Sequence, residues 1–129
     1  MIYNLAQYLI VNLATINFVV NGFSPDSNQD EIMISETGGE PQHWYDRTDW
    51  TVQVLSRAKN VNTAKKQIDD VYEKLKNKIG LSLPEVTVAG VVYPAVQTYQ
   101  ISPIQTPGYL GANEENMEMF SFNLIVTTT

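Results

Sequence analysis

The clearest pattern in the sequence is the alternation of apolar and polar residues over 48–59, which predicts one long strand. The apolar positions fall on one face and are Trp50, Val52, Val54 and Ala58. The polar positions fall on the other and are Thr51, Gln53, Arg57 and Lys59, with Leu55 as the apolar exception. Such alternation indicates a sheet that is buried mainly on one side.

A helical repeat follows this strand over 63–79. Asn62 or Thr63 is expected to cap the helix, and Gly80 is expected to end it. Strand and helix each have an apolar surface that needs cover, so we expect them to pack together as the centre of the fold. The apolar residues of the helix recur at steps of three and four and are Ala64, Ile68, Val71, Leu75 and Ile79.

The same spacing predicts a first helix over 2–15. Its apolar stripe consists of Ile2, Leu5, Ala6, Leu9 and Leu13. Its opposite face carries no charge and consists of Tyr3, Gln7, Tyr8, Val11 and Asn12. Because exposed helix faces normally carry charged residues, two interpretations stay open. Either the helix lies between the sheet and a loop, or it is partly buried between subunits.

The rest of the chain reads as short strands and turns. Gly38 and Gly39 are expected to end the second strand, and Pro41 to prevent the chain from re-entering the sheet at once. The 103–116 segment is a long polar excursion rich in proline and glycine. The further predicted strands are 17–21, 31–36, 85–92 with a bend at Gly90, 95–102 and 117–127.

The predicted order is α-β-β-β-α-β-β in a single domain, 1–129. Consecutive strands favour antiparallel pairing, and two helices can cover one face of a sheet. The fold class is therefore α+β, with an antiparallel β-sheet covered on one face by two helices. Pairing of 95–102 with 117–127 makes a long projecting C-terminal hairpin. The core face of the last strand is expected to hold Phe120, Phe122, Leu124 and Val126, with Glu118 near the rim.

Composition narrows the possible functions. The chain of 129 residues is 43% hydrophobic, carries a net charge of -6 and has no cysteine. An acidic chain without a basic stripe is a poor candidate for gripping nucleic acid or an anionic membrane. Lack of cysteine excludes disulfides, thiolate catalysis and cysteine metal sites. The N-terminal segment is interrupted by Asn and Gln, which argues against a membrane span, and it lacks the basic start of a signal peptide.

No catalytic or metal-binding constellation stands out. Asp26, Asn28 and Asp30 have the initial spacing of a calcium loop, but Glu31 replaces the required glycine and Thr37 the bidentate glutamate. His43 is the single histidine and has no marked nucleophile beside it. We therefore expect no cofactor, no metal and no enzymatic activity. Trp44 and Tyr45 lie in the same loop as His43 and suit either the core or contact with a partner.

Several short motifs, taken in order, resemble a family of tailed-phage proteins called minor capsid or tail terminator proteins. They are ETGGEP at 36–41, VQVLSR at 52–57, YEKL at 72–75, PGYLG at 107–111 and FSFN at 120–123. With the first helix, the resemblance covers nearly the whole chain. The motif positions that it marks are Gly38, Gly39, Pro41, Gln53, Arg57, Gly108 and Gly111.

The resemblance implies a structural virion protein. Such proteins form a ring, commonly six-fold, at the head-proximal end of the tail tube. The ring ends tube polymerisation and meets the head connector, while DNA passes through its lumen without sequence-specific binding. The resemblance also implies that the protein assembles in the host cytoplasm and does not associate with a membrane. Related small α+β proteins serve as head completion or tube proteins, and a small soluble protein- or ligand-binding domain is the alternative from another class.

If this role holds, the uncharged helix face and the loops are the expected contact surfaces. Six copies at -6 each would give a ring of about -36, which would repel DNA phosphates and let DNA slide. The interface residues proposed from the sequence are Tyr3, Gln7, Tyr8, Asp26, Asp30, His43, Trp44, Tyr45, Tyr109, Leu110, Glu114 and Glu115.

Overall fold

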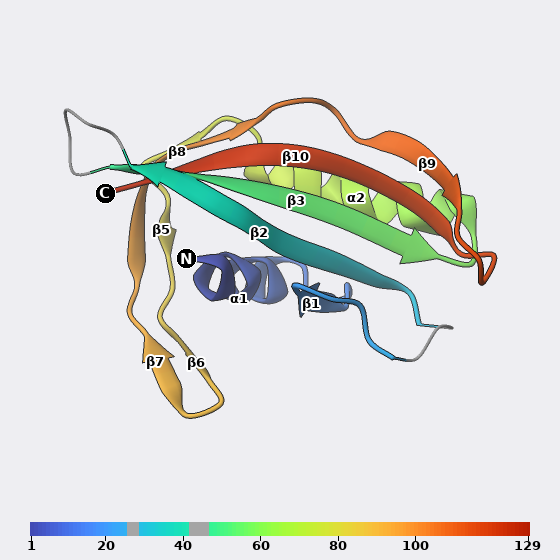
Figure 1. The fold of residues 1–129 in the computed structure, drawn as a ribbon, viewed down its shortest axis with the longest axis horizontal. Coiled ribbons are helices and arrows are strands. Elements are labelled where there is room, and N and C mark those ends of the chain that lie inside the picture. Colours follow the sequence, from blue (N-terminus) through green and yellow to red (C-terminus); the bar gives the residue numbers. More distant parts are fainter. Residues whose placement is uncertain (26–28, 42–46) are drawn as a thin grey trace.

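A computed structural model describes residues 1–25, 29–41 and 47–129. One large sheet carries most of the strands, and a two-stranded hairpin projects from it (Figure 1). The elements in chain order are α1 (Ile2–Asn12), β1 (Phe18–Val20), β2 (Glu31–Pro41), β3 (Thr48–Ala58), α2 (Val61–Leu75), β4 (Lys78–Ile79), β5 (Ser82–Leu83), β6 (Val86–Val88), β7 (Val91–Tyr93), β8 (Val96–Pro103), β9 (Gly108–Ala112) and β10 (Glu118–Thr128).

The large sheet has the order β1-β2-β3-β10-β8-β4, with β9 paired to β10 and β5 to β8. All of its ladders are antiparallel except that of β1 and β2, which pair in parallel. The α+β prediction is confirmed, but antiparallel pairing of consecutive strands was wrong for this first pair. The long 21–30 connection makes a parallel pair possible, since it carries the chain back to the same end of the sheet.

The two longest strands form the centre of the sheet. β3 and β10 pair over their full lengths, from Thr48 opposite Thr128 to Ala58 opposite Glu118. Val52 and Val54 on β3 are fully buried, and the predicted apolar face of β10 is buried from Phe120 to Val126. The alternation of both strands therefore predicts the core face correctly.

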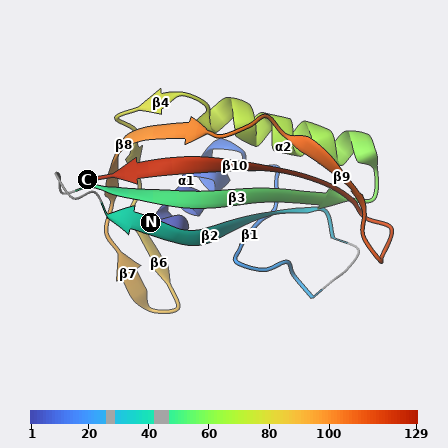
Figure 2. The ribbon, with the colours of Figure 1, turned by 45° about the horizontal axis from the view of Figure 1, so that its top comes forward.

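Both helices pack on this face, and β2, β3 and β10 run in front of α1 in Figure 2. The stripe of α2 predicted from Ala64 to Leu75 is fully buried. Residues of α1, α2 and the sheet belong to one hydrophobic core. The opposite face of the central sheet carries no helix of the described chain.

The boundaries of the helices differ from the prediction. Asn60, rather than Asn62 or Thr63, caps α2, and its side chain accepts a hydrogen bond from the Asn62 N–H at 2.8 Å. The helix ends at Leu75, because Lys76 adopts an extended conformation (ψ 134°), and Asn77 at φ 54° then leads the chain into β4. Ile79, predicted on the helical stripe, lies in β4 and is 81% exposed. The first helix ends at Asn12 instead of residue 15.

Gly38 and Gly39 do not end the second strand, contrary to the prediction. The register of β2 against β3 shifts between Glu36 and Gly39, and Gly38 has φ 109°. Such a bulge accommodates the glycine pair, and the strand continues to Pro41. The register of β1 reaches only from Ile32 to Ile34, so β2 is an edge strand at Pro41, which is a position where sheets tolerate proline.

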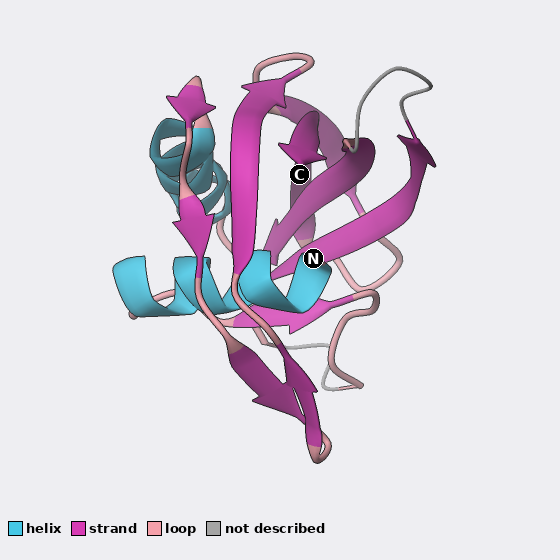
Figure 3. Cartoon of the chain, turned by 90° about the vertical axis from the view of Figure 1, so that its left-hand side faces the viewer, coloured by secondary structure: helices cyan, strands magenta, loops and turns pink. Residues whose placement is uncertain are grey.

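The segment predicted as one strand bent at Gly90 is a hairpin. Ala89 (φ 50°) and Gly90 (φ 80°) form a two-residue turn between β6 and β7. We call residues Val86–Tyr93 the arm. It projects beyond α1, away from the large sheet (Figure 3).

The predicted C-terminal hairpin is present, but the 103–116 excursion is more ordered than expected. It contains β9, which pairs with β10 from Gly108 opposite Ser121 to Ala112 opposite Glu118. A turn over 113–116 joins the two strands. β8 and β9 thus lie in succession along the same side of β10.

Candidate assembly surfaces

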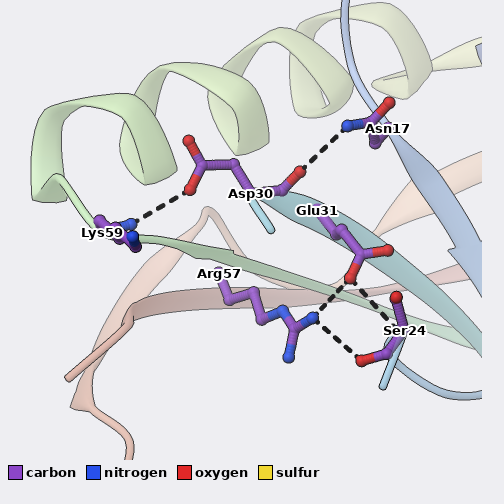
Figure 4. A network of polar contacts seen from close by, with 6 residues as sticks. All are labelled: Asn17, Ser24, Asp30, Glu31, Arg57 and Lys59. Carbon is purple, nitrogen blue, oxygen red and sulfur yellow. Dashed lines mark hydrogen bonds and ion pairs between the residues drawn. The ribbon is translucent and has the colours of Figure 1, made fainter. Parts of the chain in front are cut away.

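A buried ion pair secures the loop between β1 and β2 (Figure 4). Arg57 is 4% exposed and Glu31 2%, and 2.5 Å separates Arg57 Nη2 from Glu31 Oε1. The same Nη2 donates to the Ser24 carbonyl at 3.2 Å, and the Ser24 N–H donates to Glu31 Oε1 at 3.2 Å. The Phe23 ring lies 4.4 Å from Arg57 Cζ. Residues 23 and 24 are therefore fixed against the sheet by charge-assisted hydrogen bonds.

Asp30 fixes the other end of the loop. Its Oδ1 accepts a hydrogen bond from the Lys59 N–H at 3.2 Å, and its carbonyl accepts one from Asn17 Nδ2 at 3.4 Å. Asp30, proposed from the sequence as an interface residue, thus holds the loop within its own chain. Asp26 lies outside the described residues.

Arg57 lies on the predicted polar face of β3, but it is buried there. Alternation along β3 identifies the face on which Arg57 lies but not what covers it. Glu31 stands directly opposite Arg57 in the β2–β3 register. Opposite charges near the ends of two predicted neighbouring strands were the available signal, but the register needed to align them was not known from the sequence.

The ETGGEP motif is explained by contact with Trp50. A Cβ atom on Gly39 would lie 2.9 Å from Thr48 Cγ2 and 3.0 Å from Trp50 Cε3, so only glycine fits there. The indole N–H of Trp50 donates to Thr128 Oγ1 at 2.9 Å. Gly39 of the motif therefore allows β2 to pack closely against the Trp50 indole, which also forms a hydrogen bond with the end of β10.

The helix-free face of the central strands forms an open surface of half-buried side chains. In register, Met33 lies beside Leu55, and Gln53 lies between Ser35 and Asn123. The charged residues described on the three central strands of this face lie near its ends. The Arg57–Glu31 pair is at one end; Glu40 and Asp49 are at the other, and Asp49 Oδ1 accepts from the Thr127 hydroxyl at 2.7 Å. The uncharged middle of the face consists of Met33, Ser35, Thr51, Gln53, Leu55, Ser121, Asn123 and Ile125.

The C-terminal hairpin places four of the proposed interface residues on the surface. Tyr109 and Leu110 on β9 are 56% and 60% exposed, and Glu114 and Glu115 are exposed in the turn. The Tyr109 hydroxyl donates to the Glu118 carboxylate, and this hydrogen bond raises the pKa of Tyr109. Gly111, with φ 98°, lies beside the register shift that brings these residues to the edge of the sheet.

The uncharged face of α1 is partly covered by the arm. Tyr3, Gln7 and Tyr8 are half-buried, and the rings of Tyr3 and Tyr93 are 4.9 Å apart. The structure thus accounts for Tyr3 by intramolecular packing, which is closer to the first of the two interpretations. The exposed apolar residues of α1 are Ile10 and Val11.

Asn4, which sequence reasoning assigned no role, holds the base of the arm. It is 1% exposed, and its Nδ2 lies 3.0 Å from the Pro84 carbonyl oxygen, 2.9 Å from that of Pro94 and 3.3 Å from that of Tyr93. The amide therefore satisfies carbonyl groups on both sides of the hairpin. Asn4 lies on the helix face opposite the predicted apolar stripe, so the spacing gave no signal for this role, which depends on where the arm packs.

Replacing Asn4 with leucine is expected to lower the free energy of unfolding by roughly 2 kcal/mol, because buried carbonyls lose their donor. Urea denaturation measures this change, and limited proteolysis should show faster cleavage within 84–94. The matched control is Asn12→Leu, since the Asn12 side chain is exposed and bonds only the Tyr8 carbonyl of its own helix. Equal stability and equal cleavage of the two variants would contradict this role for Asn4.

Some predicted features lie outside the described residues, namely His43, Trp44 and Tyr45. Among the residues that the structure describes, no group of three or more His, Cys, Asp or Glu side chains is arranged to hold a metal ion. No helix in that part of the chain is long and apolar enough to cross a membrane.

Comparison with known proteins gives one match. A family model described as "Bacteriophage tail terminator protein" matches residues 5–129, which is nearly the whole chain. No curated protein matches the chain.

Proposed function

The chain belongs to the bacteriophage tail terminator family, and from this premise we propose that it forms a ring at the head-proximal end of a phage tail. The match over residues 5–129 is the observation that carries this proposal. The ring ends polymerisation of the tail tube and offers its other surface to the head connector. The protein acts as a structural component of the virion and not as an enzyme.

The surfaces of the chain are compatible with ring formation. A closed ring needs a heterologous contact, in which one surface of a subunit meets a different surface of the next. The arm and the C-terminal hairpin project from opposite ends of the sheet, as Figures 1 and 2 show. Projecting elements at two ends suit contacts to neighbouring subunits and to the rings above and below.

The charge distribution supports passage of DNA through such a ring. Five of the eight basic residues, but only three of the fourteen acidic ones, lie between Lys65 and Lys78. The helical side therefore holds most of the positive charge, and the rest of the chain is strongly acidic. A lumen lined by the uncharged open face and rimmed by acidic loops would not bind phosphates tightly.

Reversing the loop charges tests this account of the lumen. Replacing Glu114 and Glu115 with lysine is expected to slow DNA ejection severalfold, because phosphates would then find counter-charges along their path. Raising the salt concentration should restore the rate. The control replaces Asp69 and Glu73 on α2 with lysine, which is the same change in net charge at residues outside the proposed rim. Equal ejection rates in both variants and the parent would count against the acidic rim.

The ring itself is tested by the mass of the purified protein across a concentration series, with negative-stain images, alone and with purified tail tubes. We expect rings of about six copies, either free or capping the tubes, and tubes that stop growing once capped. Stacking of the rings into long tubes would instead assign the protein a tube role. A monomer that ignores the tubes would overturn the proposal in favour of a small binding domain.

A further inference from the structure

The arm is an apolar hairpin that the rest of the chain leaves largely uncovered. β6 and β7 pair only with each other among the described strands, and Val91 and Val92 are 53% and 54% exposed. A lone two-stranded hairpin is marginally stable in water, and its solvent-exposed apolar side chains add no stabilisation from burial. Such a sequence is typical of an element that is buried against a partner.

The arm is also free of charge, although the chain as a whole is acidic. No charged side chain occurs from Val86 to Asn113. Copies of a chain with a net charge of -6 repel one another, and burial of unpaired charges is costly. An uncharged arm therefore offers a surface through which like-charged copies can meet, and depletion of charge is characteristic of interface centres.

The hydrogen bonds at the base of the arm fix its direction. Asn4 bridges the Pro84 and Pro94 carbonyls, and Tyr3 packs on Tyr93. An element held in its binding geometry loses little conformational entropy on association. Contacts with α1 thus hold the base of the arm in place.

A groove that could receive a hairpin tip lies between residues 15–16, just after α1, and the first half of α2. Its volume is about 380 Å³, and its charged lining is limited to the ion pair of Lys66 with Asp70. Gln67 contributes a side-chain oxygen, Oε1, that is buried and accepts no hydrogen bond from the described residues. A buried acceptor without a donor is costly, so it favours an incoming N–H group. The full lining is Thr15, Ile16, Asn62, Thr63, Lys66, Gln67 and Asp70.

We propose that the arm of one subunit enters this groove on the next copy of the same chain and so closes the ring. The inference rests on the proposed function and adds the contact that carries it. Figures 1 and 2 show α2 beginning at the end of the molecule away from the arm, so projection and groove form a head-to-tail pair. The free backbone edges of the arm supply N–H donors for Gln67 Oε1.

Engineered cysteines test this contact directly, because the natural chain has none. A Val91→Cys/Thr63→Cys variant, oxidised under conditions in which the parent forms rings or caps tail tubes, is expected to give a covalent ladder ending near six copies. A mixture of the two single variants should stop at dimers, since each chain then has only one half of the contact. The position control is Val91→Cys/Glu73→Cys, which moves the second thiol to an exposed site on α2.

The possible outcomes distinguish a failure of the arm–groove contact from a failure of ring formation itself. Rings that form without the Val91–Thr63 cross-link, or that cross-link equally in the Glu73 control, overturn the arm–groove contact and leave the proposed function standing. A protein that stays monomeric both alone and with tail tubes overturns both.

Gln67→Met provides a second test that does not depend on cross-linking. Methionine matches the shape of glutamine but offers no strong acceptor. The variant should raise the concentration at the midpoint of assembly roughly fivefold, because the arm loses a hydrogen bond. The thermal stability of the isolated subunit should be unchanged or higher, since the buried acceptor is gone. An unchanged assembly midpoint, or a less stable subunit, would assign Gln67 a role within its own chain and contradict the proposed contact.

Discussion

Replacing Arg57 with methionine should lower the free energy of unfolding by roughly 3–5 kcal/mol, because it leaves the Glu31 carboxylate buried without its cation. Glu31 is 2% exposed and lies under residues 23 and 24, so water reaches it poorly. The Ser24 carbonyl also loses a donor, which loosens the loop between β1 and β2. Urea denaturation measures the effect. The dependence of the unfolding free energy on urea concentration should match that of the parent, which shows that only stability has changed.

Two companion variants show whether the stability depends on the pairing of the two charges or on the packing of the two side chains. The double variant Glu31→Leu/Arg57→Met should recover most of the loss, since well-packed apolar residues often replace a buried ion pair at little cost. Lys65→Met removes the exposed pair with Asp69 and should change stability by about 1 kcal/mol or less. If Arg57→Met were as mild as Lys65→Met, the pair would be hydrated in solution and the account of the loop would fail.

Phe122→Ala is expected to cost a similar amount, roughly 3–5 kcal/mol, for a different reason. Phe122 is fully buried at the middle of β10, beside Val54 in the register. Its ring meets that of Tyr72 on α2 edge-on, with 5.5 Å between centroids. Truncation leaves a cavity where sheet and helix meet, so the loss includes both transfer and cavity terms.

The control lies on the same strand. Ile125 points to the open face and is half-buried, so Ile125→Ala removes a side chain without opening the core. We expect it to cost clearly less in the same urea denaturation series. Comparable losses for the two variants would mean that the open face is packed as tightly as the core, contrary to the half-buried state of its side chains.

Sequence patterns predict the centre of this fold because periodicity and burial coincide there. Val52, Val54 and the stripe of α2 are buried as their spacing requires. The burial of Arg57 could not be predicted, since it depends on the register between β2 and β3. Alternation is a property of one strand, whereas register is a property of two.

The errors at turns have a related cause. Residues 86–93 look like one apolar strand, because the turn inside them uses Ala89 at φ 50°, a conformation that alanine rarely adopts. A glycine pair such as Gly38–Gly39 predicts the end of a strand, although glycine also permits a bulge within one. The groove was beyond sequence reasoning, because its lining comes from the turn after α1 and from α2, which share no local pattern.

The position of β10 has a consequence for the order of events during synthesis. β3 and β8 do not pair with each other, since β10 lies between them. A nascent chain that has emerged only to residue 117 therefore carries two unsatisfied strand edges, and its helices have only part of a sheet to cover. Insertion of 118–128 joins both halves in one late step, which raises the sequence separation of the contacts and slows folding. Until then, each growing chain exposes edges on which neighbouring chains can misassociate, so a delay at the ribosome would favour aggregation over assembly.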